Sequence, residues 1–202
     1  MHRGLVHLAL LVPLFAATVG CDNDNGNGAD LGAADLGGAA LFDQGFARAT
    51  EADVASILLT VNAGEIMVAE AAQPGLATQA AKDYAQMMID MHSAARTRQL
   101  ALFQQLAITP NDANPFTQML MVETARILTI IPNLGGVELD RFYVDTQVQM
   151  HQSAVDLVDF VLLPNSATPA LVQELMTTRT AIVQHLALAK QLQSSLAGDG
   201  GV

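Results

Sequence analysis

The sequence predicts an all-α protein, an antiparallel four-helix bundle with one long crossover that contains a short fifth helix. Hydrophobic residues make up 51% of the 202 residues, whereas aromatic residues make up only 4%. Alanine and straight-chain residues lose little rotamer freedom in a helix, while sheets favour aromatic and β-branched side chains. The single cysteine excludes a disulfide scaffold, and the prolines after Thr50 fall between helical segments.

Start and stop signals divide the chain from Thr50 onward into five helices. Thr50 and Asp53 resemble a capping box and open the first helix, which should stop at Pro74-Gly75. Asn114 followed by Pro115 is typical of an N-cap with proline at the first helical position. The five expected helices cover residues 50–74, about 76–107, 115–130, about 137–163 and 169–196.

The lengths of the connections predict the topology of the bundle. Short loops after the first and the fourth helix predict two antiparallel hairpins. The segment 108–136 is long enough to carry the chain from one end of the bundle to the other, with the short helix inside it. A bundle with one long crossover has the ferritin-like arrangement.

Residues 1–20 have the pattern of an export signal. One arginine, an apolar run over 5–19 and then small residues are typical of a signal peptide over 1–20, because the run is too short to span a bilayer. Cys21, the only cysteine, follows Thr18-Val19-Gly20, which resembles a lipobox. We therefore expect a lipid on Cys21 that holds the protein at the periplasmic face of the cell envelope, with inner or outer membrane left open. Ordinary signal-peptidase cleavage nearby is the alternative.

Composition divides the rest of the chain. Residues 21–45 hold mostly Asp, Asn, Gly and Ala, which is typical of a flexible tether, and 46–197 form the helical domain. The last residues, 198–202, are expected to be a disordered tail. The net charge is −11 with only two lysines, so no surface favours nucleic acid, and the lipid anchor is the expected contact with a membrane.

Three histidines remain after residue 20, one in each of the second, fourth and fifth helices: His92, His151 and His185. Apolar residues three and four positions away predict that they face the core. Each lies about 14 to 16 residues into its helix, which places all three near the middle of the bundle at about 1.5 Å per residue. Such a cluster is suited to a single transition-metal ion, zinc, copper or iron.

A second interpretation of the histidines stays open. A core histidine is often satisfied by a carbonyl, a glutamine or water, and Gln147 lies one turn before His151. No histidine has an acidic residue three positions earlier, which disfavours a di-iron site built on Glu-x-x-His. If a metal is bound, Met88 and Met91 beside His92 favour copper. The sequence therefore assigns no cofactor, and a single transition-metal ion remains the alternative.

A buried polar network is the second expected feature of the core. Glu65 lies on the apolar stripe of the first helix, where an ionised carboxylate needs a partner or its pKa rises. Counting from the shared end of the first hairpin offsets Glu65 from His92 by about 14 Å. We therefore expect Glu65 outside the histidine site, in a network with Asp140 and Tyr143.

Four short patches, taken together, resemble a bacterial family. The chain is similar over about 46–196 to ferritin-like proteins called domain of unknown function 4142, often labelled predicted outer membrane proteins. The resemblance implies a ferritin-like fold and a cell-envelope location and assigns no activity. The patches are Asn62-Ala63-Gly64-Glu65-Ile66, the run from Tyr84 to His92, Leu139-Asp140-Arg141-Phe142-Tyr143 with His151, and His185-Leu186.

Two functions remain as hypotheses. The chain has no G-x-S-x-G, Walker A or G-x-G-x-x-G motif and no cysteine in the helical domain, so an enzyme is not indicated. The first hypothesis is a non-enzymatic envelope lipoprotein whose bundle binds a protein or small-molecule partner, for example in stress response. The alternative is a metal-binding bundle that uses His92, His151 and His185.

Overall fold

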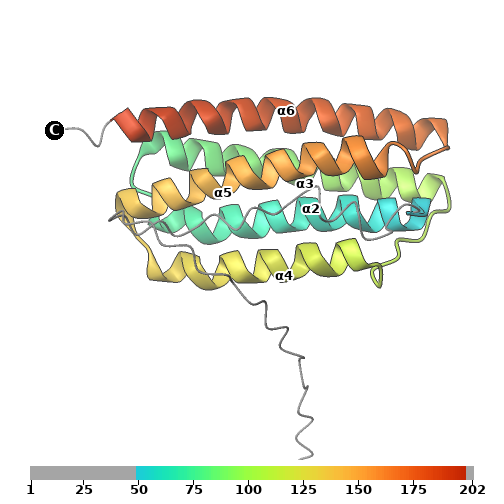
Figure 1. Cartoon of the computed structure of the whole chain (residues 1–202), viewed down its shortest axis with the longest axis horizontal. Coiled ribbons are helices and arrows are strands. Elements are labelled where there is room, and N and C mark those ends of the chain that lie inside the picture. Colours follow the sequence, from blue (N-terminus) through green and yellow to red (C-terminus); the bar gives the residue numbers. More distant parts are fainter. Residues whose placement is uncertain (1–48, 199–202) are drawn as a thin grey trace, which may run out of the picture. The chain divides into compact units, whose positions relative to one another are not determined.

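The computed structural model describes residues 49–198 and confirms the all-α bundle (Figure 1). No strand occurs among these residues, and each helix begins and ends within a few residues of its expected position, except that the fourth expected helix is α-helical only to Leu157. The predicted signal peptide, Cys21, the whole predicted tether over 21–45 and the tail after 198 lie outside the described residues. The helices are α2 (Glu51–Ala72), α3 (Gln79–Gln105), α4 (Pro115–Ile130), α5 (Gly136–Leu157) and α6 (Pro169–Gly198).

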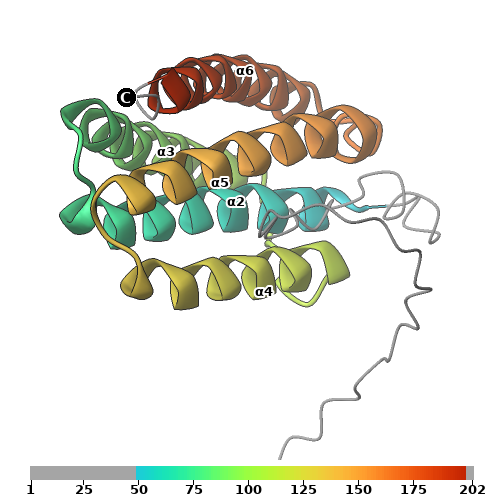
Figure 2. The ribbon, with the colours of Figure 1, turned by 60° about the vertical axis from the view of Figure 1, so that its left-hand side comes forward.

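Two antiparallel hairpins build the bundle. A 3-10 turn, η1 (Gln73–Gly75), joins α2 to α3, and α5 leads into α6 through η3 (Val158–Leu162). Helix α4 packs along α2 on the side away from α6 and returns the chain to the end where α3 began. As a result α3 and α5 run in the same direction, as Figures 1 and 2 show. The long crossover predicted over 108–136 is therefore α4 with its flanking loops.

The caps explain where the helices begin. Thr50 N donates to Asp53 Oδ2 over 2.8 Å, and Asp53 N donates to Thr50 Oγ1 over 3.2 Å, which makes the predicted capping box. At the start of α4, Thr117 N donates to Asn114 Oδ1 over 2.9 Å, with Pro115 in the first turn. These local signals fix the chain positions at which the bundle turns.

One feature of the fourth helix was not predicted. The helix expected over about 137–163 is α-helical only to Leu157 and continues as the π-helical turn η3, where Leu163 N donates to Val158 O over 2.9 Å. A π turn adds one residue per turn and therefore rotates the residues after it relative to α5. Apolar periodicity alone does not distinguish such a turn from α-helix.

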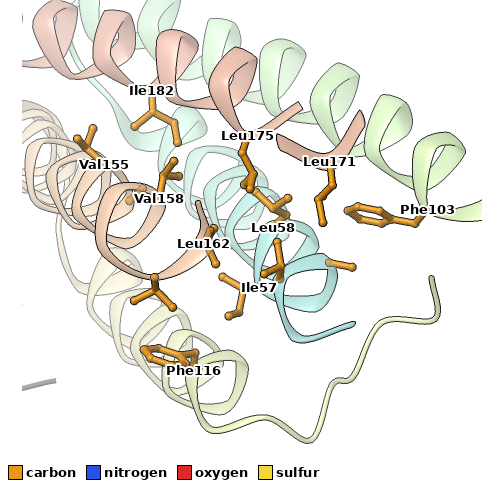
Figure 3. Close-up of a cluster of buried hydrophobic side chains, with 14 of the residues drawn as sticks. Ile57, Leu58, Phe103, Phe116, Val155, Val158, Leu162, Leu171, Leu175 and Ile182 are labelled. Carbon is orange, nitrogen blue, oxygen red and sulfur yellow. The ribbon is translucent and has the colours of Figure 1, made fainter. Parts of the chain in front are cut away.

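The core consists of two hydrophobic clusters with polar side chains between them. Figure 3 shows the first cluster, which joins the start of α2, the end of α5 with η3, and the first half of α6. The second cluster joins the end of α2, the start of α3, the start of α5 and the end of α6. Polar side chains that are buried at intermediate positions along the helices include Asn62, Glu65, His92, Gln99, Gln147, His151, Thr178 and His185.

One described segment, Glu51–Gly75, is long and apolar enough to cross a membrane by length and composition. It comprises α2 and η1, and more than half of its most apolar window is buried in the bundle. Helix α2 contacts α3, α4 and α5, so burial among other helices accounts for its apolar composition.

Gly64 allows α2 and α4 to approach each other closely. A Cβ atom built at Gly64 would lie 2.7 Å from Thr124 Oγ1, well inside van der Waals contact. Gly64→Ala should therefore destabilise the protein by about 1 kcal/mol, because overpacking outweighs the gain in helix propensity. In a Thr124→Ala background the same change should stabilise by up to about 1 kcal/mol. Urea unfolding of the four proteins measures both effects, and equal signs in the two backgrounds would contradict the close approach.

Candidate metal centre

The structure brings the three predicted histidines together. His92 on α3, His151 on α5 and His185 on α6 are each no more than 5% exposed. Their ring centroids lie 5.7, 5.3 and 5.4 Å apart, with every pair of rings steeply inclined. One nitrogen from each ring lies within 4.8 Å of the other two, so the three side chains form a compact donor group.

Hydrogen bonds occupy one ring nitrogen of His92 and one of His151. His92 Nδ1 lies 2.8 Å from Asn62 Oδ1, and His151 Nδ1 lies 2.9 Å from the Gln147 carbonyl. Both partners accept only, so Nδ1 carries the proton in each ring and Nε2 carries a lone pair. His92 Nε2, His151 Nε2 and His185 Nδ1 are buried and have no hydrogen-bond partner. Buried polar atoms are normally paired, so three orphaned nitrogens in one place need an explanation.

The surroundings keep the three imidazoles neutral. Burial lowers the pKa of His92 to about 3, helped by the nearby His151 and His185. Burial also lowers the pKa of His151 to about 4 and that of His185 to about 4. At neutral pH the rings therefore present lone pairs without first losing a proton, which is the state that binds a metal ion.

The three histidine nitrogens would bind one metal ion if each moved slightly toward a common centre. Three atoms within 4.8 Å of one another have a common point no farther than about 2.8 Å from each, whereas zinc–imidazole bonds measure about 2.0–2.1 Å. Each nitrogen would therefore move inward by less than about 1 Å. Rotation of the side chains is enough for such a shift, so the three residues fit a single ion.

A cavity leads toward this cluster. It has a volume of about 170 Å³ and is lined by both His92 and His185, together with the exposed side chain of Met91. Most of its other lining residues are apolar. The cavity offers an access path from solvent and room for a small fourth ligand on the side of the histidines that it reaches.

The expected separation of Glu65 from the histidine site is wrong. Glu65 Oε1 lies 3.6 Å from His151 Nδ1, and Glu65 Oε2 accepts a hydrogen bond from Gln147 Nε2 over 2.9 Å. Leu76 and Gly136 pair with each other, so they lie at the same height along the bundle axis. Glu65 lies 11 residues from this height and His151 lies 15 residues from it on the same side. The difference of four residues separates their Cα atoms by about 6 Å along the axis. The helices are antiparallel and side chains tilt toward each helix N-terminus, so these two tilt toward each other.

Glu65 is protonated at neutral pH. Burial raises the pKa of its carboxyl to about 8, and the hydrogen bond from Gln147 offsets only part of the increase. The 3.6 Å contact with His151 is therefore a contact between two neutral groups, since burial disfavours the charged form of both. Glu65 faces the Nδ1 side of His151, opposite the free Nε2, so it is a neighbour of the donor group and not a fourth donor.

The other two predicted network residues lie elsewhere. Asp140 does not join Glu65: its carboxylate accepts from Ala77 N over 2.7 Å and from Thr78 N over 2.9 Å, and so binds the α2–α3 turn to the start of α5. The hydroxyl of Tyr143 is buried without a hydrogen-bond partner, and its ring contacts Tyr84 edge-on. Burial and the nearby Glu65 raise the pKa of Tyr143. A single network of Glu65, Asp140 and Tyr143 is not what the structure contains.

The two methionines that the sequence associates with copper lie in different surroundings. Met88 is fully buried in the second hydrophobic cluster, and Met91 is 46% exposed at the cavity. The sequence did not predict Asn62 as a polar partner of the cluster. Its side chain forms one hydrogen bond with His92 and another with Gln99. Its signal in the sequence was a lone amide on the apolar stripe of α2, one turn before Glu65.

Comparison with known proteins gives one result. The model of a family described as "Domain of unknown function (DUF4142)" matches residues 39–192. The matched range includes α2 to α5, most of α6 and all three clustered histidines. Comparisons with curated proteins and with solved structures find no match. The family description assigns no activity, so the chemistry of the site has to be argued from its own residues.

Proposed function

The chain belongs to the family described as Domain of unknown function (DUF4142), and from that premise we propose that its bundle binds one transition-metal ion through His92, His151 and His185. Two observations carry the proposal: each of the three rings has a buried nitrogen without a hydrogen-bond partner, and one nitrogen from each ring lies within 4.8 Å of the other two. A purely structural role for three core histidines would leave three orphaned polar atoms, each costing about 1–3 kcal/mol. Binding of an ion would satisfy all three at once.

The donor set supports a divalent ion that prefers imidazole. Three neutral nitrogens suit zinc or copper(II). Three protein ligands leave a fourth position, which the cavity beside His92 and His185 leaves accessible to water or a small ligand. When bound, the ion would supply Lewis acidity at that position. Glu65, close to His151, would help to offset the added charge.

Elemental analysis of the full chain purified without an affinity tag tests the proposal. We expect about one zinc or copper per chain after exposure to the metal, and zinc binding that survives Gln152→Leu but is lost in His151→Leu. Gln152 is the matched control, because it is the exposed neighbour of His151 on the same helix. Circular dichroism checks that both variants fold. Wild-type protein with no bound metal, and no thermal shift with zinc, copper, iron or manganese, would contradict the proposal.

We also propose that the protein is exported and held at the periplasmic face of the cell envelope by a lipid on Cys21. The signal-like residues 1–20, the position of the cysteine directly after them and the tether-like 21–45 support this. Cys21→Ser should move the protein from the membrane fraction to the soluble fraction. A Cys21→Ser variant that still sediments with membranes would contradict lipid anchoring.

A further inference from the structure

A chain of buried hydrogen bonds connects His92 to the protein surface. His92 Nδ1 lies 2.8 Å from Asn62 Oδ1, and Asn62 Nδ2 donates to Gln99 Oε1 over 2.8 Å. Gln99 Nε2 donates to Glu174 Oε1 over 3.2 Å, and Arg98 donates to both oxygens of Glu174 over 2.9 Å. Every member except Arg98 is at most 7% exposed, whereas the Arg98 side chain is 47% exposed.

The donors and acceptors in this series of hydrogen bonds can be assigned in only one consistent way. Arginine can only donate and a carboxylate can only accept, so Glu174 must accept a hydrogen bond from the side-chain amide group of Gln99. Gln99 then turns its carbonyl toward Asn62, which must donate with Nδ2 and accept with Oδ1. Only a protonated Nδ1 on His92 fits that acceptor, and this leaves the lone pair on Nε2, the free nitrogen of the metal cluster.

Two further contacts support the same orientation of the Asn62 and Gln99 side-chain amides. Asn62 Nδ2 also donates to the Leu58 carbonyl over 2.8 Å, so a flipped amide would place its oxygen against two acceptors. Thr178 lies between Gln99 and Glu174, within 3.3 Å of Gln99 Nε2 and 3.1 Å of Glu174 Oε1. Its hydroxyl accepts from the first and donates to the second, which agrees with the direction set by Arg98.

We propose that Gln99, Glu174 and Arg98 are positioning residues that act through Asn62 to hold His92 as its Nδ1–H tautomer, and so set the affinity of the cluster for metal. The statement about affinity rests on the proposed function, whereas the statement about the tautomer concerns the metal-free protein. Partners that orient metal-binding histidines typically change metal affinity by about 10- to 100-fold when they are removed.

A second ion pair on α6 supplies a matched control. Arg179 donates to Asp159 through two nitrogens, over 2.5 and 2.8 Å, in the same bidentate geometry as the Arg98–Glu174 pair. It connects α6 to η3, and none of the described hydrogen bonds links it to a histidine. Glu174→Gln and Asp159→Asn therefore remove the same kind of interaction, but only the first lies on the chain to His92.

The test uses 15N-labelled, metal-free full chain and zinc as the probe. Ring-nitrogen shifts should report one tautomer of His92 in the wild type and a measurable Nε2–H population in Glu174→Gln and Gln99→Met. Zinc affinity should fall by about 10-fold in these two variants and by up to about 100-fold in Asn62→Leu, which removes the direct partner. Asp159→Asn should match the wild type in both measurements, and thermal unfolding checks that all variants fold.

The outcomes separate this proposal from the proposed function. Wild-type tautomer and wild-type zinc affinity in both Gln99→Met and Glu174→Gln would overturn the positioning role, whether or not Asn62→Leu is impaired. Equal losses in Asp159→Asn and Glu174→Gln would also overturn it, because the effect would then be one of general stability. If wild-type protein binds no zinc, the proposed function fails, while the tautomer measurement still decides the orientation of His92.

Discussion

Lowering the pH of the metal-free protein from about 6.5 to 4.5 is expected to reduce its free energy of unfolding by about 5 kcal/mol. The histidine cluster is the cause. Burial holds the pKa of His92 at about 3 and those of His151 and His185 at about 4. In the unfolded chain the same groups return to about 6.5. The unfolded state therefore binds three more protons across this range, and the stability present above about pH 6.5 is lost as the pH falls.

Glu65 acts in the opposite direction. Its folded pKa of about 8 lies above the unfolded value, so the folded state holds a proton that the unfolded state releases. The stability contributed by this proton is fully present below about pH 4.5 and is lost as the pH rises toward about 8. Three protons gained by the unfolded state minus one gives a net difference of two. The expected slope is therefore about 2.7 kcal/mol per pH unit between about pH 4.5 and 6.5.

Replacing Glu65 makes the sign of each contribution measurable. Glu65→Gln keeps the shape and removes the opposing proton, so the slope should rise to about 4 kcal/mol per pH unit. Urea unfolding in the presence of a chelator, repeated across this pH range, gives both slopes. A loss of this size is comparable with the whole stability of many domains, which is about 5–15 kcal/mol. A wild-type slope below about 1.4 kcal/mol per pH unit, which corresponds to a difference of one bound proton, would show that the imidazoles are not held neutral by burial.

The sequence was sufficient for the fold because its signals are local. The capping box at Thr50 and Asp53 and the Asn114-Pro115 start each depend on residues within one turn, so no tertiary information is needed. Convergence of the three histidines was also predictable. Each lies on an apolar stripe at a similar depth, and both properties can be obtained from residue counts.

The surroundings of the histidines were not predictable in the same way. The distance from Glu65 to His151 depends on the tilt of two side chains and on the level at which two helices meet, and a count of residues along one hairpin contains neither. In the sequence, Asn62 and Gln99 are polar residues on otherwise apolar helix faces. Their hydrogen-bond partners lie on other helices, so the sequence alone does not indicate what they do. Asp140 looked like a core network residue because the groups that donate to its carboxylate, the amides of 77 and 78, lie in a turn about 60 residues away in sequence.

Zinc is expected to stabilise the folded protein strongly. Free zinc at 1,000 times its dissociation constant should raise the free energy of unfolding by about 4 kcal/mol, as for any ligand that binds only the folded state. For a domain of this size the gain corresponds to about 8–16 °C in the midpoint of thermal unfolding. His151→Leu should lose the shift and Gln152→Leu should keep it, as measured by calorimetry with and without chelator.

The same binding reaction should release about one proton near pH 6, and that proton should come from Glu65. The imidazoles are already neutral there, since burial lowers their pKa values to about 3 to 4. An ion on His151 Nε2 would place positive charge near Glu65 and return its raised pKa toward the ordinary range. Titration calorimetry in buffers of different ionisation enthalpy counts the protons, and Glu65→Gln should bring the count close to zero. Exposed histidines with ordinary pKa values would instead release about two protons in both proteins, and that result would contradict a buried, neutral metal site.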